Sequence, residues 1–88
     1  MLYMVIETYL HGPAPVYARA FERGRMLPPG LAYLGSWVDE RSLDRCFQLM
    51  ETEEPKLLDE WIAHWGDLVE FEIVPVLTSR DAAARMAG

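Results

Sequence analysis

The sequence has little of what would stabilise a small fold or identify a function. It has 88 residues and one cysteine, Cys46, so no disulfide can form within the chain. No apolar run approaches the roughly 18 residues that span a membrane. The opening segment MLYMVIETYL is apolar, but it lacks a basic start and contains Glu7, so it does not resemble a secretion signal. We therefore expect a cytoplasmic protein with a reduced thiol and no membrane association.

Basic residues are scarce as well. The chain has 8 Lys and Arg against 14 Asp and Glu, and its formal net charge is −6. Because binding to phosphates needs a surplus of cations, this balance argues against a nucleic-acid partner. The chain also has no Gly-rich phosphate loop, no serine nucleophile elbow and no CxxC. Glu60 and His64 are spaced as a metal pair would be, but two ligands do not make a site. We expect no cofactor and no metal.

About half of the residues are apolar, 51%, which is enough for one small core. Domains of this size usually need disulfides, a metal or oligomerisation for stability. Oligomerisation is the support that remains here. We expect a single domain at residues 1–78 and a short C-terminal tail at residues 79–88, where Ser79 caps a final Ala-rich turn.

The residue pattern predicts six main elements in the order βαββαβ. Runs of β-branched and aromatic residues predict strands at residues 2–9, 31–38, 43–50 and 69–77. Apolar residues at helical spacing predict helices that begin near Pro15 and Pro55. Pro75 fits an edge strand or a bulge. This order is typical of the α+β, ferredoxin-like fold, in which both helices cover one face of an antiparallel sheet. The expected buried stripe of the second helix is Leu57, Leu58, Trp61, Ile62 and Trp65.

Alternate side chains of a strand point to opposite faces of the sheet. One coherent apolar set is expected under the helices: Met4, Ile6, Leu34, Val38, Phe47, Leu49, Phe71 and Ile73. The other set, which we expect on the uncovered face, is Tyr3, Val5, Glu7, Tyr9, Tyr33, Gly35, Trp37, Cys46, Gln48, Met50, Glu70, Glu72 and Val74. Large apolar patches mark interfaces or ligand grooves. We therefore predict a homodimer through this sheet face, with either an aromatic-lined pocket or solid packing between the two sheets.

The candidate functional residues belong to the second set. Glu7, placed among aromatic residues, is expected to have a raised pKa and to act as a general acid or base. The alternative is a hydrogen-bonded or ion-paired residue at the mouth of the barrel. Gln48 would orient a ligand carbonyl or bond across the dimer. The expected ligand contacts are Tyr9, Tyr33, Trp37, Cys46, Gln48 and Glu72.

Several residues have a simpler structural interpretation. Cys46 is expected to be an inert buried thiol, because nothing nearby in the sequence lowers its pKa. Arg25 follows Gly24 and would bind an anionic group or remain a solvated cation at the end of a helix. Trp61 and Trp65 are expected to pack against the sheet as core residues.

Four segments carry a resemblance to a known family. MLYMVIETY, GRMLPPGLAYLGSWV, RCFQLME and WIAHWGDLVEFEIVPV resemble an uncharacterised bacterial family of small domains of unknown function, over about residues 1–78. That family is similar to the dimeric α/β-barrel superfamily of ferredoxin-like proteins, which implies a homodimer. The superfamily includes cofactor-free monooxygenases, muconolactone-isomerase-like enzymes, haem proteins and binding proteins, so kinship of fold does not select an activity.

Two functional hypotheses follow. The first is a small-molecule-binding or structural dimer that takes a small apolar or aromatic ligand. The second is a cofactor-independent monooxygenase- or isomerase-like enzyme for a small aromatic or ketonic substrate, with Glu7 as the base and Gln48 or a tyrosine as the polarising donor. We favour the first, because the sequence shows no acid/base pair with an oriented partner.

Overall fold

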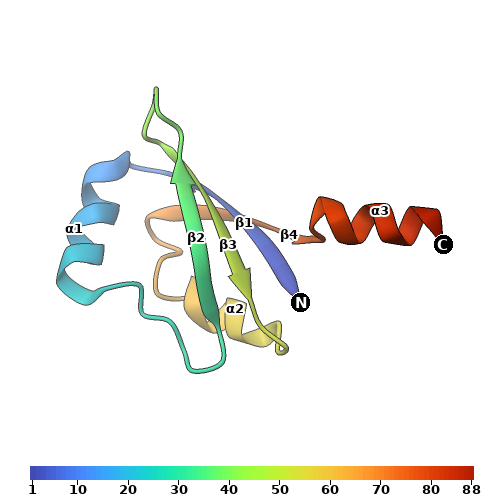
Figure 1. Ribbon diagram of the computed structural model, residues 1–88. Coiled ribbons are helices and arrows are strands. Elements are labelled where there is room, and N and C mark those ends of the chain that lie inside the picture. The colour runs from blue at the N-terminus through green and yellow to red at the C-terminus, as the bar shows by residue number, and fades with distance from the viewer.

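The computed structural model describes all 88 residues and has the predicted element order. The elements are β1 (Leu2–Tyr9), α1 (Pro13–Arg23), β2 (Ala32–Val38), β3 (Arg45–Glu51), α2 (Lys56–Ile62), β4 (Val69–Val76) and α3 (Ser79–Ala87). The four strands form one antiparallel sheet in the order β2-β3-β1-β4, and helices α1 and α2 lie on one side of that sheet (Figure 1). This is the ferredoxin-like α+β fold.

Prolines mark the elements as the sequence predicts. Pro15 lies in the first turn of α1, where its missing N–H costs no hydrogen bond, and Pro55 caps the start of α2. Pro75 lies in β4, which is an edge strand of the sheet. The stripe of α2 is confirmed, although the helix ends at Ile62 and Trp65 is buried from the turn that follows.

The C-terminal segment is more ordered than predicted. Residues 79–88 contain the nine-residue helix α3 rather than a single turn. Its cap is Thr78 and not Ser79, because the Thr78 hydroxyl oxygen accepts a hydrogen bond of 3.0 Å from the backbone N–H of Asp81. None of its residues is buried, and it projects away from the sheet (Figure 1).

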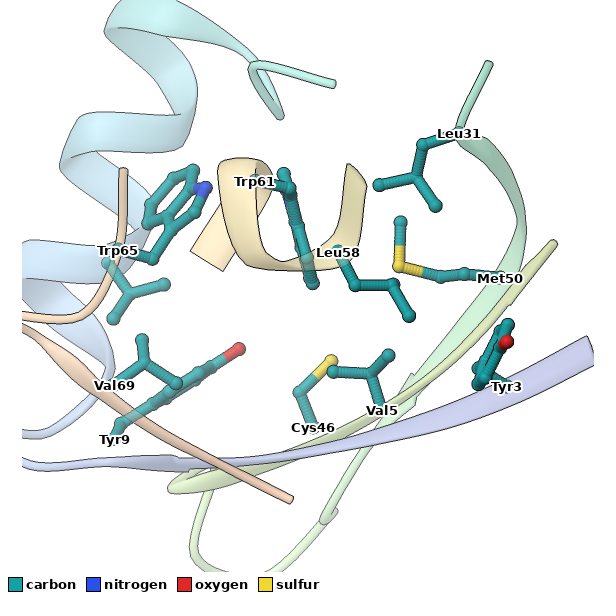
Figure 2. Packing of buried hydrophobic residues seen from close by; sticks show 11 residues of the cluster. Tyr3, Val5, Tyr9, Leu31, Cys46, Met50, Leu58, Trp61, Trp65 and Val69 are labelled. Carbon is teal, nitrogen blue, oxygen red and sulfur yellow. The ribbon is translucent and has the colours of Figure 1, made fainter. Parts of the chain in front are cut away.

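The helices cover the opposite face of β1 and β3 from the one predicted. Tyr3, Val5 and Met50 are buried and pack with Leu58 and Trp61 of α2 (Figure 2). The expectation that Tyr3, Val5 and Met50 lie on the uncovered face is therefore wrong, and so is the placement of Met4, Ile6, Phe47 and Leu49 under the helices.

The pairing with β4 explains this difference. Residues directly opposite each other in an antiparallel pair point to the same face. Phe71 lies opposite Glu7, and Ile73 lies opposite Val5. Phe71 and Ile73 pack against the core as predicted, so Glu7 and Val5 must face the helices with them.

A bulge between Tyr33 and Gly35 also disturbs the alternation in β2. Tyr33 lies opposite Met50 and faces the helices, whereas Trp37 lies opposite Phe47 on the uncovered side. Leu34 and Val38 are both predicted to lie under the helices. The prediction is wrong for Leu34, which is exposed.

The uncovered side of the sheet is still apolar. Trp37 is 59% exposed there, and the half-buried residues around it have no helix above them. We call this surface the open face, and it consists of Met4, Ile6, Trp37, Phe47, Leu49, Val74 and Val76, with Arg45, Glu70 and Glu72 at one end. No helix of the structure has the length and apolar character required to cross a membrane.

Candidate ligand-binding site

A cavity of about 380 Å³ lies between α1 and the covered face of the sheet. Strands β1, β2 and β3 form its floor, and α1 forms one wall. Trp61 of α2 and Trp65, from the turn after α2, close another side. The lining residues are Glu7, Tyr9, Val16, Tyr17, Ala20, Phe21, Gly24, Arg25, Ser36, Val38, Cys46, Gln48, Trp61 and Trp65.

Two buried polar side chains meet at the floor of the cavity. Glu7 of β1 is 5% exposed and Gln48 of β3 is 8% exposed. The antiparallel register places them on neighbouring strands of one face, and Gln48 Nε2 donates a hydrogen bond to Glu7 Oε2. Gln48 Oε1 is buried without any hydrogen-bond partner. Since buried polar atoms are nearly always paired, this orphaned acceptor is an unusual feature of the floor.

Burial raises the pKa of Glu7 from 4.5 to about 7, while the hydrogen bond from Gln48 and the positive charge of Arg25 act in the lowering direction. The predicted rise in the pKa of Glu7 is therefore confirmed. A carboxyl group with this pKa exchanges its proton near neutral pH, which suits a general acid or base.

Tyr9 and Cys46 lie beside Glu7 and stay protonated. Burial, together with Cys46 and Glu7, raises the pKa of the Tyr9 phenol well above its usual range. Burial and the charge of Glu7 raise the pKa of Cys46 to about 11. Cys46 is thus a buried, unreactive thiol as predicted. Tyr9 is a hydrogen-bond donor, and Figure 2 shows its hydroxyl pointing inward toward Cys46.

Arg25 forms the rim of the cavity and is held there by the two tryptophans. Its backbone oxygen accepts hydrogen bonds from the indole N–H groups of Trp61, at 2.9 Å, and Trp65, at 3.2 Å. Its guanidinium carbon lies 3.7 Å from the centre of the Tyr33 ring, which is close cation–π stacking. Trp61 and Trp65 are therefore core residues, as predicted, that also position the rim.

The structure brings together only part of the predicted site. Glu7, Tyr9, Cys46 and Gln48 line the cavity. Tyr33 faces the same side of the sheet and touches the site through Arg25. Trp37 and Glu72 lie on the open face and do not reach the cavity.

The expected ligand contacts omit the wall of the cavity. Tyr17 and Phe21 line it and are not among them, while Arg25, which also lines it, was expected only as an anion-binding or solvated cation at the end of a helix. These residues stand four apart, so the first two share one face of α1 and Arg25 continues that line beyond its end. This spacing is a signal that the sequence carries, whereas the expected ligand contacts all lie on predicted strands.

The comparison with known families agrees with the resemblance seen in the sequence. Residues 1–88 match the domain of unknown function DUF3303 over the whole chain. The chain belongs to the DUF3303 family. No curated protein and no solved structure matches it. Within this DUF3303 chain no three His, Cys, Asp or Glu side chains are grouped as metal ligands would be.

Proposed function

We propose that this protein binds a small, partly aromatic molecule in the cavity between α1 and the sheet. The observation that carries the proposal is the buried Glu7–Gln48 pair, with its unpartnered Gln48 Oε1, at the floor of a cavity of about 380 Å³. Small-molecule sites are typically apolar cavities of roughly 300–1,000 Å³ with a few polar groups that fix orientation.

A purely structural interior is a poorer explanation of these features. Protein cores are closely packed, and their buried polar atoms are paired. Here aromatic walls surround a space next to a carboxyl group, an amide and a phenol, contributed by Glu7, Gln48 and Tyr9. A ligand would fill the space and supply the missing hydrogen bond to Gln48.

The pKa of Glu7 supports a second candidate, a cofactor-independent enzyme. A carboxylate with a pKa of about 7 accepts a proton readily at neutral pH. In an isomerase-type reaction, Glu7 would take a proton from carbon next to a carbonyl group and return it to another carbon. The Tyr9 phenol or the Gln48 amide would donate a hydrogen bond to the carbonyl oxygen as negative charge develops there.

The proposal includes a homodimer through the open face. The face is an apolar layer with Trp37 at 59% exposure, and no element of the chain covers it. Arg45 and Glu70 flank Thr8 at one end, and neither has an ion pair within the chain. A second copy related by a two-fold axis would bury the apolar residues and offer each charge a partner.

Native mass spectrometry of the purified protein, with a panel of small aromatic compounds, tests the proposal. We expect a compound retained by the wild type to be lost or weakened in Glu7→Gln. The matched control is Glu72→Gln, which changes the same functional group on the open face, outside the cavity. Equal retention in both variants would count against the cavity as the site. If Glu7→Gln retains a compound but no longer converts it, while the wild type and Glu72→Gln do, the result would instead support the enzyme.

A further inference from the structure

The rim of the cavity holds a cation that forms no ion pair, although its charge acts on the pKa of Glu7. None of the ion pairs of the chain includes Arg25. Its backbone is held by Trp61 and Trp65, and its guanidinium group is stacked on Tyr33. Because the group is planar, positioned and still free to donate, it is well suited to bind a planar anion such as a carboxylate.

The floor of the cavity holds an acceptor that has no donor. Gln48 uses its Nε2 on Glu7, which leaves Oε1 buried and unpaired. An unpaired buried polar atom is unfavourable, and a hydroxyl or N–H group of a ligand would supply the missing hydrogen bond. A ligand atom that can only accept a hydrogen bond would leave Gln48 Oε1 unpaired.

The volume and the walls limit the size and shape of the ligand. About 380 Å³ is near the lower end of ligand-binding cavities, so a molecule with a single ring fits better than a large one. The rings of Tyr17, Trp61 and Trp65 provide apolar contacts for a planar body, whereas Phe21, at 87% exposure, lies at the outer edge.

We infer that the ligand is a small planar organic anion with a hydrogen-bond donor at the end away from its charge. The anionic group pairs with Arg25 at the exposed rim, and the donor binds Gln48 Oε1 at the buried floor. This inference rests on the proposed function and adds the charge and polarity of the molecule that the cavity takes.

The test compares three ligands that differ by one group each. The first is para-hydroxybenzoate, which has the anion and the donor. Its methyl ester lacks the anion, and para-methoxybenzoate lacks the donor. Binding is followed by NMR through the indole N–H signals of Trp61 and Trp65, which lie at the cavity. We expect each of the other two compounds to bind at least about tenfold more weakly than para-hydroxybenzoate, the effect of roughly 1.4 kcal/mol.

Variants assign each preference to its residue. Arg25→Gln should remove the preference for the acid over its ester. Arg23→Gln is the control, because Arg23 is an exposed cation at the end of α1 and does not line the cavity. This variant should leave the preference for the acid intact. Gln48→Met should remove the preference for the hydroxy over the methoxy compound. If that variant does not fold, the comparison of the two ligands on the wild type still tests the donor.

Each contrary result has a distinct meaning. Equal affinity for the acid and the ester, or for the hydroxy and methoxy compounds, would overturn the inference while leaving a small-molecule site in place. A panel in which no aromatic compound shifts either indole signal would contradict both the inference and the proposed function.

Discussion

Glu7 is a carboxyl group at the floor of the cavity, 5% exposed, and burial raises its pKa to about 7. The sequence predicts a raised pKa from the aromatic residues around it in the chain. The structure produces that rise by burial under the helices, on the face opposite to the one expected. The prediction that the pKa of Glu7 is raised therefore does not depend on which face of the sheet the helices cover, because both faces of β1 are largely apolar.

The raised pKa makes stability depend on pH. Between pH 4.5 and about 7 the folded protein holds a proton on Glu7 that the unfolded chain releases. The contribution of Glu7 to stability is thus fully present below pH 4.5 and is lost as the pH rises to about 7. We expect Glu7→Gln to gain stability relative to the wild type, by about 3 kcal/mol, across this range.

Urea denaturation of both proteins at several pH values measures this difference. The Arg19–Asp67 ion pair lowers the pKa of Asp67 to about 2, and its stabilisation is lost as the pH falls toward that value. It acts equally in both proteins and cancels. If the unfolding free energies of the wild type and Glu7→Gln change with pH in parallel, Glu7 does not titrate as described.

At the scale of elements, the connection between α1 and β2 depends on Gly30. Its φ is +97°, in the left-handed region, and an added Cβ would lie 2.9 Å from Leu57 Cδ1 of α2. We expect Gly30→Ala to lower the free energy of unfolding by about 1–2 kcal/mol, because the positive φ disfavours any side chain, whereas the Leu57 methyl group can move aside.

The matched control for Gly30 is Gly66→Ala. An added Cβ at Gly66 would meet its nearest atom, the backbone oxygen of Ile62, at 3.7 Å, an ordinary contact distance. We expect a change within about 0.5 kcal/mol there. Thermal or chemical denaturation of both variants provides the comparison, and equal losses would contradict the role given to Gly30.

At the scale of the whole molecule, one chain exposes more surface than its size predicts. Its accessible surface is 5939 Å², against roughly 5,300 Å² for a compact monomer of this mass. The radius of gyration of 14.2 Å likewise exceeds the roughly 12 Å typical of a chain this long. The projecting α3, none of whose residues is buried, contributes to this excess, and the open face has no element of the chain above it.

Sedimentation of two variants tests the homodimer. Trp37→Ala removes the largest exposed side chain of the open face, and Leu10→Ala removes a side chain of similar exposure, 50% against 59%, outside the strands. We expect the first to weaken association by about tenfold or more, since tryptophan is enriched among interface hot spots, and the second to leave it unchanged. A wild type that sediments as a monomer at micromolar concentration would refute the dimer.

The sequence by itself determined the order of the elements and the fold class. Prolines at the starts of the helices, helical spacing of the apolar residues and uninterrupted strand-forming runs are local signals, so they are readable without contacts. The stripe of α2 and the edge position of Pro75 follow from the same local rules.

Only the tertiary structure decided which face of the sheet the helices cover. In β1 and β3 both alternate sets are largely apolar, so a period of two residues gives no contrast. The contrast exists in β4, where Glu70 and Glu72 alternate with Phe71 and Ile73, and strand pairing transfers it to β1. The cavity depends on that pairing and on where α1 and Arg25 pack, which are contacts between residues far apart in the chain.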